Sequence, residues 1–241
     1  MKREKVLRPA DAKALYAQAV RYYNGSVVRK NWKRSFLLAT KAAEMGNIEA
    51  ENALGAYYDY GVGVAQDSAA AFDHYEKAAI AGYPDAQYNV GACYASGNGT
   101  RVNYRKAIEW FKRAAKAKVP EALHELGYSY RYGRGVKRDP RAGFKLEMAA
   151  AKVGVLEAQF SVGVCFSKGE GVRANPTEAF RWFITAARRG HRDAAHNVAC
   201  FYETGKGVPK NALRANHWYA RAGETLGREA MPRVRRPKSD A

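Results

Sequence analysis

The sequence predicts an all-α fold, a right-handed superhelical solenoid of helix-turn-helix repeats. Three features predict it, because an alanine, an aromatic residue and a pair of glycines each recur with a period of 36 residues. The alanine series is Ala50, Ala86, Ala122, Ala158 and Ala194. The aromatic series is Tyr58, Tyr94, Tyr130, Phe166 and Tyr202. No insertion or deletion interrupts the period from Ala14 to Ala230, so chance does not explain it.

The first helix of a repeat is expected over about Ala50–Tyr60, where Ala50, Leu54 and Tyr58 form one apolar stripe. Gly55 lies beside this stripe, and a glycine inside a helix costs roughly 1 kcal/mol relative to alanine. Equivalent glycines are Gly91, Gly127 and Gly163. This recurrence predicts a close helix crossing that a side chain would block. The glycine pairs that then stop the helix are Gly61/Gly63, Gly97/Gly99, Gly133/Gly135, Gly169/Gly171 and Gly205/Gly207.

The second helix of each repeat has its own start and stop signals. The predicted N-cap residues are Asn31, Asp67, Asn103, Asp139, Asn175 and Asn211. Their side-chain oxygens can accept a free backbone N–H of the first turn. Glycines expected to end this helix in a left-handed conformation are Gly46, Gly82, Gly154 and Gly190. Lys118 takes the glycine position in the third repeat.

These signals predict a single solenoid domain over residues 14–223. Its six repeats are 14–49, 50–85, 86–121, 122–157, 158–193 and 194–223. The first repeat is degenerate, because Asn24-Gly25-Ser26-Val27 keeps one glycine, and it is expected to act as an N-terminal cap. Residues 1–13 are predicted to be a basic segment, and residues 224–241 a partial helix followed by a basic disordered tail.

The repeat unit reads ALHELGYSYRYGRGVKRDP from Ala122 and AQFSVGVCFSKGEGVRANP from Ala158. It resembles the Sel-one-like repeat family, a relative of tetratricopeptide arrays, over about residues 12–223. The resemblance implies an adaptor or scaffold that binds other proteins. Some cysteine-rich relatives are described as penicillin-binding or weakly β-lactamase-like, with paired cysteines in every repeat. This chain lacks those pairs, so that activity is not expected here.

A partner is expected on the concave face of the solenoid. The resemblance to the Sel-one-like repeat family implies that the first helices of the repeats line this face. At 100° per residue, certain positions of these helices point away from the apolar stripe. The predicted partner-binding residues are Tyr60, Tyr88, Asn89, His124, Glu125, Tyr128, Tyr132, Phe160, Ser161, His196 and Asn197. Aromatic groups beside hydrogen-bonding groups suit a protein or peptide partner. The alternative is that the aromatic row packs against the first helix of the neighbouring repeat.

The net charge of +18 raises nucleic acid, a membrane surface and an acidic protein as partners. Within residues 50–85, Lys77 is the one basic residue against six acidic residues. This acidic stretch interrupts any continuous basic track for a nucleic-acid strand. A protein or peptide, an acidic one included, is therefore the favoured partner. Nucleic-acid binding through the basic second helices and the termini is the alternative function.

No enzyme activity, cofactor or metal site is expected, and no catalytic residue is predicted. The five histidines show no metal-ligand spacing, and neither a phosphate-binding loop nor a nucleophile elbow occurs. The odd number of cysteines, Cys93, Cys165 and Cys200, indicates a reducing, cytoplasmic setting. The basic N-terminus lacks the apolar core of a secretory signal, and no stretch has the roughly 18 apolar residues of a membrane span. The alternative to a cytoplasmic setting is that this chain is part of an exported protein.

Overall fold

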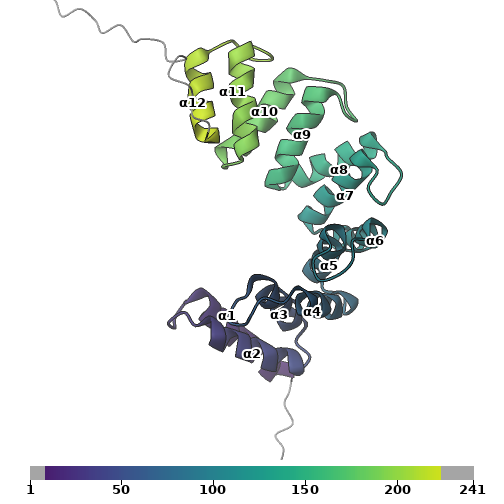
Figure 1. Ribbon diagram of the computed structural model, residues 1–241, viewed down its shortest axis with the longest axis vertical. Coiled ribbons are helices and arrows are strands. Elements are labelled where there is room, and N and C mark those ends of the chain that lie inside the picture. The colour runs from purple at the N-terminus through teal and green to yellow at the C-terminus, as the bar shows by residue number, and fades with distance from the viewer. Residues whose placement is uncertain (1–8, 224–241) are drawn as a thin grey trace, which may run out of the picture. The chain divides into compact units, whose positions relative to one another are not determined.

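The computed structural model describes residues 9–223, in which every element is an α-helix and no strand occurs. The helices are α1 Pro9–Asn24, α2 Trp32–Glu44, α3 Ile48–Tyr60, α4 Ser68–Ile80, α5 Pro84–Ser96, α6 Tyr104–Lys116, α7 Pro120–Tyr132, α8 Pro140–Lys152, α9 Leu156–Lys168, α10 Pro176–Arg188, α11 Arg192–Thr204 and α12 Ala212–Ala222 (Figure 1). We call the odd-numbered helices A helices and the even-numbered ones B helices. The predicted all-α fold of repeated helix pairs is confirmed.

The chain divides into two compact units, Met1–Asp139 and Pro140–Ala241. Unit 1 contains α1 to α7 and unit 2 contains α8 to α12. Within each unit, every helix packs against the next one along the chain. Helix α1 begins at Pro9, inside the predicted N-terminal segment 1–13. The predicted tail at 224–241 lies outside the described residues, and the single domain at 14–223 stays a prediction.

The B helices begin at the predicted capping residues. The side chains seen to accept a backbone N–H of the first turn are Asn31, Asp67, Asn103, Asn175 and Asn211. Oδ1 of Asp67, for example, accepts from the amides of Ala69 and Ala70 at 3.0 Å each. A capped N-terminus contributes about 1 kcal/mol relative to alanine. The sequence signal therefore located these helix starts correctly.

The glycines inside the A helices lie against an aromatic ring of the following B helix. A Cβ added at Gly55 would stand 2.5 Å from Cδ1 of Tyr75, closer than any real carbon contact. The corresponding distance is 2.6 Å between Gly91 and Phe111. In unit 2 the equivalent pair is Gly163 and Phe183, at 2.7 Å. The prediction that a side chain would block a close helix crossing is confirmed at Gly55, Gly91 and Gly163.

The second glycine of each Gly-x-Gly pair has a further role beyond ending the A helix. Gly99 has a φ of +69° and touches the backbone carbonyl of Ser68, at the start of the preceding repeat's B helix. A side chain at Gly99 would collide with that carbonyl. The same contact recurs at Gly63 with Trp32, Gly135 with Tyr104, Gly171 with Pro140 and Gly207 with Pro176. These glycines therefore hold consecutive repeats together within each unit.

The glycines predicted to end B helices have left-handed backbones, and Lys118 adopts the same conformation with a φ of +66°. A side chain in this conformation costs roughly 1–2 kcal/mol. We expect Lys118→Gly to raise the free energy of unfolding by about 0.5–1 kcal/mol, because strain relief outweighs the added freedom of the unfolded chain. Urea unfolding followed by circular dichroism measures this change.

The neighbouring Ala117 provides the control for this prediction, because its φ of −82° is ordinary for any residue. Ala117→Gly should lower the free energy of unfolding by up to about 1 kcal/mol. If both substitutions destabilised the protein equally, strain at Lys118 would not be the cause.

Candidate functional site

The most exposed aromatic side chains of the A helices lie at the C-terminal ends of α3 and α7 in unit 1. Tyr60 is 77% exposed and Tyr132 is 46% exposed. The ring of Tyr128 packs 4.5 Å from that of Tyr132, and the guanidinium of Arg134 lies 5.0 Å from the centre of the Tyr128 ring. These three predicted residues, Tyr60, Tyr128 and Tyr132, therefore offer amphipathic surface that a partner protein can bury.

The predicted aromatic row is divided between the core and the surface. Tyr88 packs on Phe111 with 5.8 Å between ring centres, and Phe160 stacks on His191 at 4.3 Å. Both rings are half-buried and belong to the packing between helices. His124 is also half-buried, whereas His196 is exposed. Tyr88 and Phe160 therefore belong to the packing of the helices, and their ring contacts are with Phe111 and Phe183 of the B helices α6 and α10 and with His191 before α11.

The predicted polar row lies partly between the A helices. Asn89 on α5 donates from Nδ2 to Oδ1 of Asn52 on α3 at 3.0 Å. Ser161 is buried, so the prediction that this side chain is exposed to a partner is wrong. Ser161 faces packed helices, because neighbouring helices cover more of the circumference of an A helix than the apolar stripe alone occupies. Asn197 is half-buried, and its Nδ2 donates to the carbonyl of Asp193 at 2.7 Å.

A groove between α1 and α3 contains aromatic residues that the sequence analysis did not select. Its lining residues are Tyr16, Val20, Tyr23, Ala53, Ala56, Tyr57, Tyr60 and Val62. The first repeat is degenerate in sequence and is predicted only to cap the array, so none of the predicted site residues lies on it. The signal was present, since Tyr16, Val20 and Tyr23 follow the i, i+4, i+7 spacing of one helix face.

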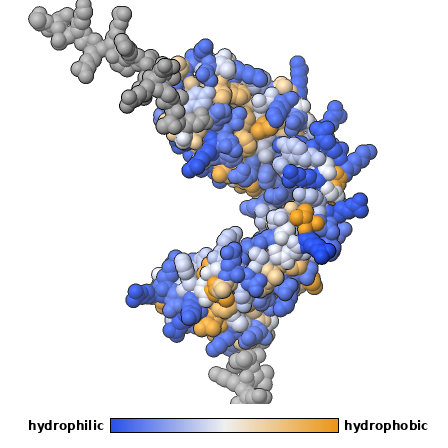
Figure 2. Space-filling view, viewed as in Figure 1, coloured by the Kyte–Doolittle hydropathy of each residue, from blue (hydrophilic) through white to orange (hydrophobic). Residues whose placement is uncertain are grey.

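The charge of the A helix α3 differs in sign from that of α6, the most basic B helix. Helix α3 carries Glu49, Glu51 and Asp59 without any lysine or arginine. Around α6, by contrast, the exposed cations are Arg101, Arg105, Lys106, Lys112, Arg113, Lys116 and Lys118. The face of the molecule in Figure 2 is mostly hydrophilic, with hydrophobic residues in small separate patches. Recognition at the A helices is therefore expected to rely on tyrosine rings and charge.

Two titrating groups among the predicted residues have shifted pKa values. Burial raises the pKa of Tyr88 to about 12, and the nearby carboxylates of Glu125 and Glu121 act in the same direction. Burial also raises the pKa of Glu125, against the opposing effect of Arg134. Both groups therefore lie partly removed from water, between the A helices.

Residues 9–223 contain no group of three or more histidine, cysteine, aspartate and glutamate side chains arranged to hold a metal ion. Cys93, Cys165 and Cys200 are free thiols, the first two of them buried. None of the described helices is both long and apolar enough to cross a membrane. The described residues thus offer surfaces that another macromolecule can contact. By its fold, the protein is an all-α helical-repeat protein.

A family model described as "Sel1 repeat" matches residues 10–47, 48–83, 84–119, 120–152, 156–191 and 192–224. The chain belongs to the Sel1 repeat family. This family consists generally of protein-interaction scaffolds, and its fold is typically non-catalytic. A comparison with curated proteins found no match.

Solved structures agree with this assignment. A Sel1 repeat protein from Oxalobacter formigenes is 31% identical, with a TM-score of 0.81 over 92% of this chain and 90% of the other. The protective antigen c5321 of uropathogenic Escherichia coli, which has an SLR fold, is also 31% identical, with a TM-score of 0.79 over 88% of this chain. This chain spans 45% of the length of c5321. The immunity protein Pa5087 of Pseudomonas aeruginosa is 23% identical, with a TM-score of 0.57 over 90% of this chain and 83% of the other, and shares the fold.

The raised pKa of Glu125 predicts how stability depends on pH. Because the folded state favours the neutral carboxyl, the group destabilises the fold as pH rises from its ordinary value of 4.5 through the raised pKa. We expect Glu125→Gln to raise the unfolding temperature at pH 7 and to leave it nearly unchanged at pH 4. Thermal melts at both pH values test this, and an equal effect at both would contradict the burial of this charge.

Proposed function

We propose that this protein is an interaction scaffold that binds a protein or peptide on the A-helix face of unit 1. The observation that carries the proposal is the exposure of Tyr60 and Tyr132 at the ends of two A helices. Tyrosine is enriched at binding hot spots, because its ring buries a large area while its hydroxyl keeps a polar contact. Membership of the Sel1 repeat family supports the same function.

The predicted residues support this site to different degrees. Tyr60, Tyr128 and Tyr132 present accessible ring surface, and the half-buried Asn89, His124 and Glu125 lie on the A helices between them. The packing of Tyr88 makes it a support for this surface. In unit 2, exposed His196 and half-buried Asn197 offer a smaller polar area, whereas Phe160 belongs to a core cluster. Unit 1 is therefore the favoured location.

We further propose that the protein works in a reducing compartment such as the cytoplasm. The support is the state of the three cysteines, which are free thiols, with Cys93 and Cys165 buried as small packing residues.

The exposed cations around α6 support nucleic-acid binding as a second candidate function. Asp73 and Glu76 on the preceding B helix would repel a strand that extended beyond this patch. Binding through this patch should weaken steeply as salt increases, and Arg105→Gln with Lys112→Gln should reduce that salt dependence. The absence of a gel mobility shift at about 50 mM salt would rule this function out.

The double variant Tyr60→Ala with Tyr132→Ala tests the scaffold proposal. Because both rings are exposed, the thermal melt should change little, whereas a truncated hot-spot aromatic costs about 2 kcal/mol of binding. We expect affinity capture from the native host, read by quantitative mass spectrometry, to lose the partners that the unmodified protein recovers.

The matched control is Leu37→Ala with Leu213→Ala, which removes two exposed apolar side chains from the B helices α2 and α12. This variant should keep the same partners. If the tyrosine variant also kept them, the A-helix face of unit 1 would not be the binding surface.

A further inference from the structure

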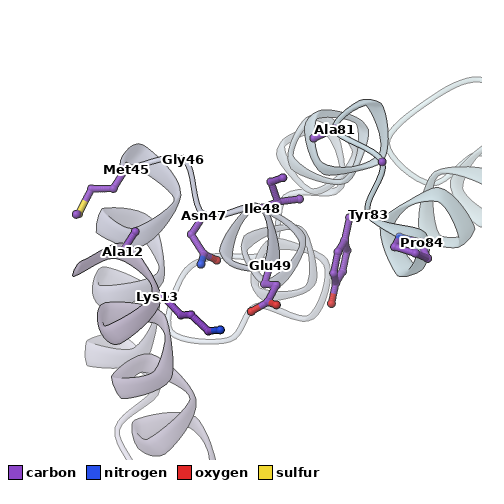
Figure 3. Close-up of a pocket in the computed structure, with 11 residues that line it drawn as sticks. Ala12, Lys13, Met45, Gly46, Asn47, Ile48, Glu49, Ala81, Tyr83 and Pro84 are labelled. Carbon is purple, nitrogen blue, oxygen red and sulfur yellow. The ribbon is translucent and has the colours of Figure 1, made fainter. Parts of the chain in front are cut away.

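Three surfaces of unit 1 can receive a partner, and they differ in charge. The groove between α1 and α3 described above is lined by uncharged residues. A hollow near the N-terminal ends of α1, α3 and α5 balances one cation with one anion, since Lys13 and Glu49 both extend into the space between α1 and α3 (Figure 3). The surface at the C-terminal end of α7, around Tyr128 and Tyr132, carries an excess of cations. This third surface therefore selects a partner by the sign of its charge.

The guanidinium of Arg134 lies at the centre of this third surface, over two tyrosine rings. Its central carbon lies 5.0 Å from the centre of the Tyr128 ring on α7 and 5.9 Å from the centre of the Tyr104 ring on α6. Such contacts attract the cation without supplying a lone pair, so its N–H groups stay available as donors. Among residues 9–223, no carboxylate pairs with this guanidinium and no acceptor takes a hydrogen bond from it. The guanidinium is therefore positioned in advance for an anion from outside the chain.

Tyr132 adds a second donor to the same surface. Its hydroxyl accepts a hydrogen bond at 2.6 Å from Nη2 of buried Arg131 and so keeps its own hydrogen for another acceptor. A hydroxyl that accepts from a cation also donates more strongly, because hydrogen bonds in a chain polarise one another. The ring of Tyr128 contacts both donors, since the Tyr132 ring lies 4.5 Å from it. Tyr128 thus joins Tyr132 and Arg134 into one surface.

Two adjoining segments surround this surface with positive charge. In the loop of residues 133–139 the exposed cations are Arg134, Lys137 and Arg138. The loop rests on the start of α6, where a Cβ added at Gly135 would stand 2.5 Å from the backbone carbon of Tyr104. Residues 100–106 contain no acidic residue, and their exposed cations are Arg101, Arg105 and Lys106. The nearby acidic residues of unit 1 are Asp139, at the end of the loop, and half-buried Glu125, so the local balance favours an anion.

We propose that this surface binds the carboxylate of an acidic side chain in an extended segment of a partner protein, an inference that rests on the proposed scaffold function. The carboxylate pairs with the N–H groups of Arg134, because a planar guanidinium matches the geometry of a carboxylate. A nearby residue of the segment packs on the exposed ring of Tyr132. Side chains two residues apart in an extended segment are separated by roughly 7 Å, so one short segment can reach both groups across the Tyr128 ring.

Two peptides that differ only in charge provide the test. Acetyl-Ala-Glu-Leu-Glu-Ala-amide is compared with the peptide in which both glutamates are glutamine, and each is titrated into isotopically labelled full-length protein. Nuclear magnetic resonance follows the ring signals of Tyr128 and Tyr132 and the Nε–Hε signal of Arg134, which is assigned from its loss in Arg134→Lys. We expect the glutamate peptide to shift these signals and to bind about threefold to fivefold more tightly at low salt. Added salt should reduce this preference.

Substitutions separate the charge of this surface from its apolar area. Arg134→Gln should abolish the preference for the glutamate peptide. Arg134→Lys should lose most of it, because lysine keeps the charge without the planar set of donors. Tyr132→Ala should instead weaken the binding of both peptides to a similar extent, because it removes ring area that either peptide can cover.

The matched control is Arg113→Gln on the B helix α6. Like Arg134, Arg113 is exposed and lies over an aromatic ring, 4.3 Å from the centre of Trp110. Because both arginines are exposed, neither substitution should change the thermal melt. Arg113→Gln should also leave the preference for glutamate unchanged. An equal loss of preference in the two variants would show that net charge alone attracts the peptide, and the proposal would fail.

Other outcomes would also overturn the proposal. Equal affinity for the two peptides, shifts confined to B helices, no shift at all, or full preference retained in Arg134→Lys would each contradict carboxylate binding at Arg134. A short single-stranded oligonucleotide that bound this surface more tightly than the glutamate peptide would show a site for phosphate, and the assignment of an acidic protein would fail.

The scaffold function is tested separately by the tyrosine double variant Tyr60→Ala with Tyr132→Ala. If that variant loses its host partners while the two peptides bind equally, the scaffold function stands and only the acidic assignment fails. If that variant keeps its partners, the scaffold site itself fails.

Discussion

The contact between a helix glycine and an aromatic ring sets the geometry of the repeats. Where Gly55, Gly91 and Gly163 remove the side chain, Tyr75, Phe111 and Phe183 press their rings onto the backbone of the A helix. This close approach buries ring area that neither helix could bury alone, at roughly 25 cal/mol per Å² of apolar surface. The glycine costs helix stability locally, and the packing it permits outweighs that cost.

Departures from this contact show how much variation a repeat accepts. In the last described repeat Ala199 replaces the glycine and is fully buried, opposite Tyr219 at the ring position. The hydroxyl of Tyr219 donates to Oε2 of Glu203 at 2.7 Å. In α8 the ring position holds Glu147, which is fully buried and accepts a hydrogen bond from Sγ of Cys165 at 3.5 Å. A polar group at this position is thus supplied with a polar partner.

The glycine–ring contacts occupy one side of each A helix that has them. The remaining sides are therefore the ones available for contacts with other A helices or with a partner. One of these faces the next A helix, as the bond between Asn52 and Asn89 shows. The other presents tyrosines, and in the first two repeats these line a groove. The degenerate first repeat therefore does more than cap the array: it supplies one wall of the candidate site. The acidic stretch of the second repeat argues against a nucleic-acid track along the array.

The sequence by itself determined the helices, their caps and their order. Those features depend on local chemistry, such as an Asp67 oxygen facing free amides or a glycine at positive φ, and local chemistry repeats every 36 residues. Only the tertiary structure decided which outward residues are exposed. Tyr60 and Tyr88 look alike in the pattern, yet Tyr60 is exposed while Tyr88 packs on Phe111. The exposure of a residue depends on whether a neighbouring helix covers it. The spacing of residues along a single helix does not show which positions a neighbouring helix will cover.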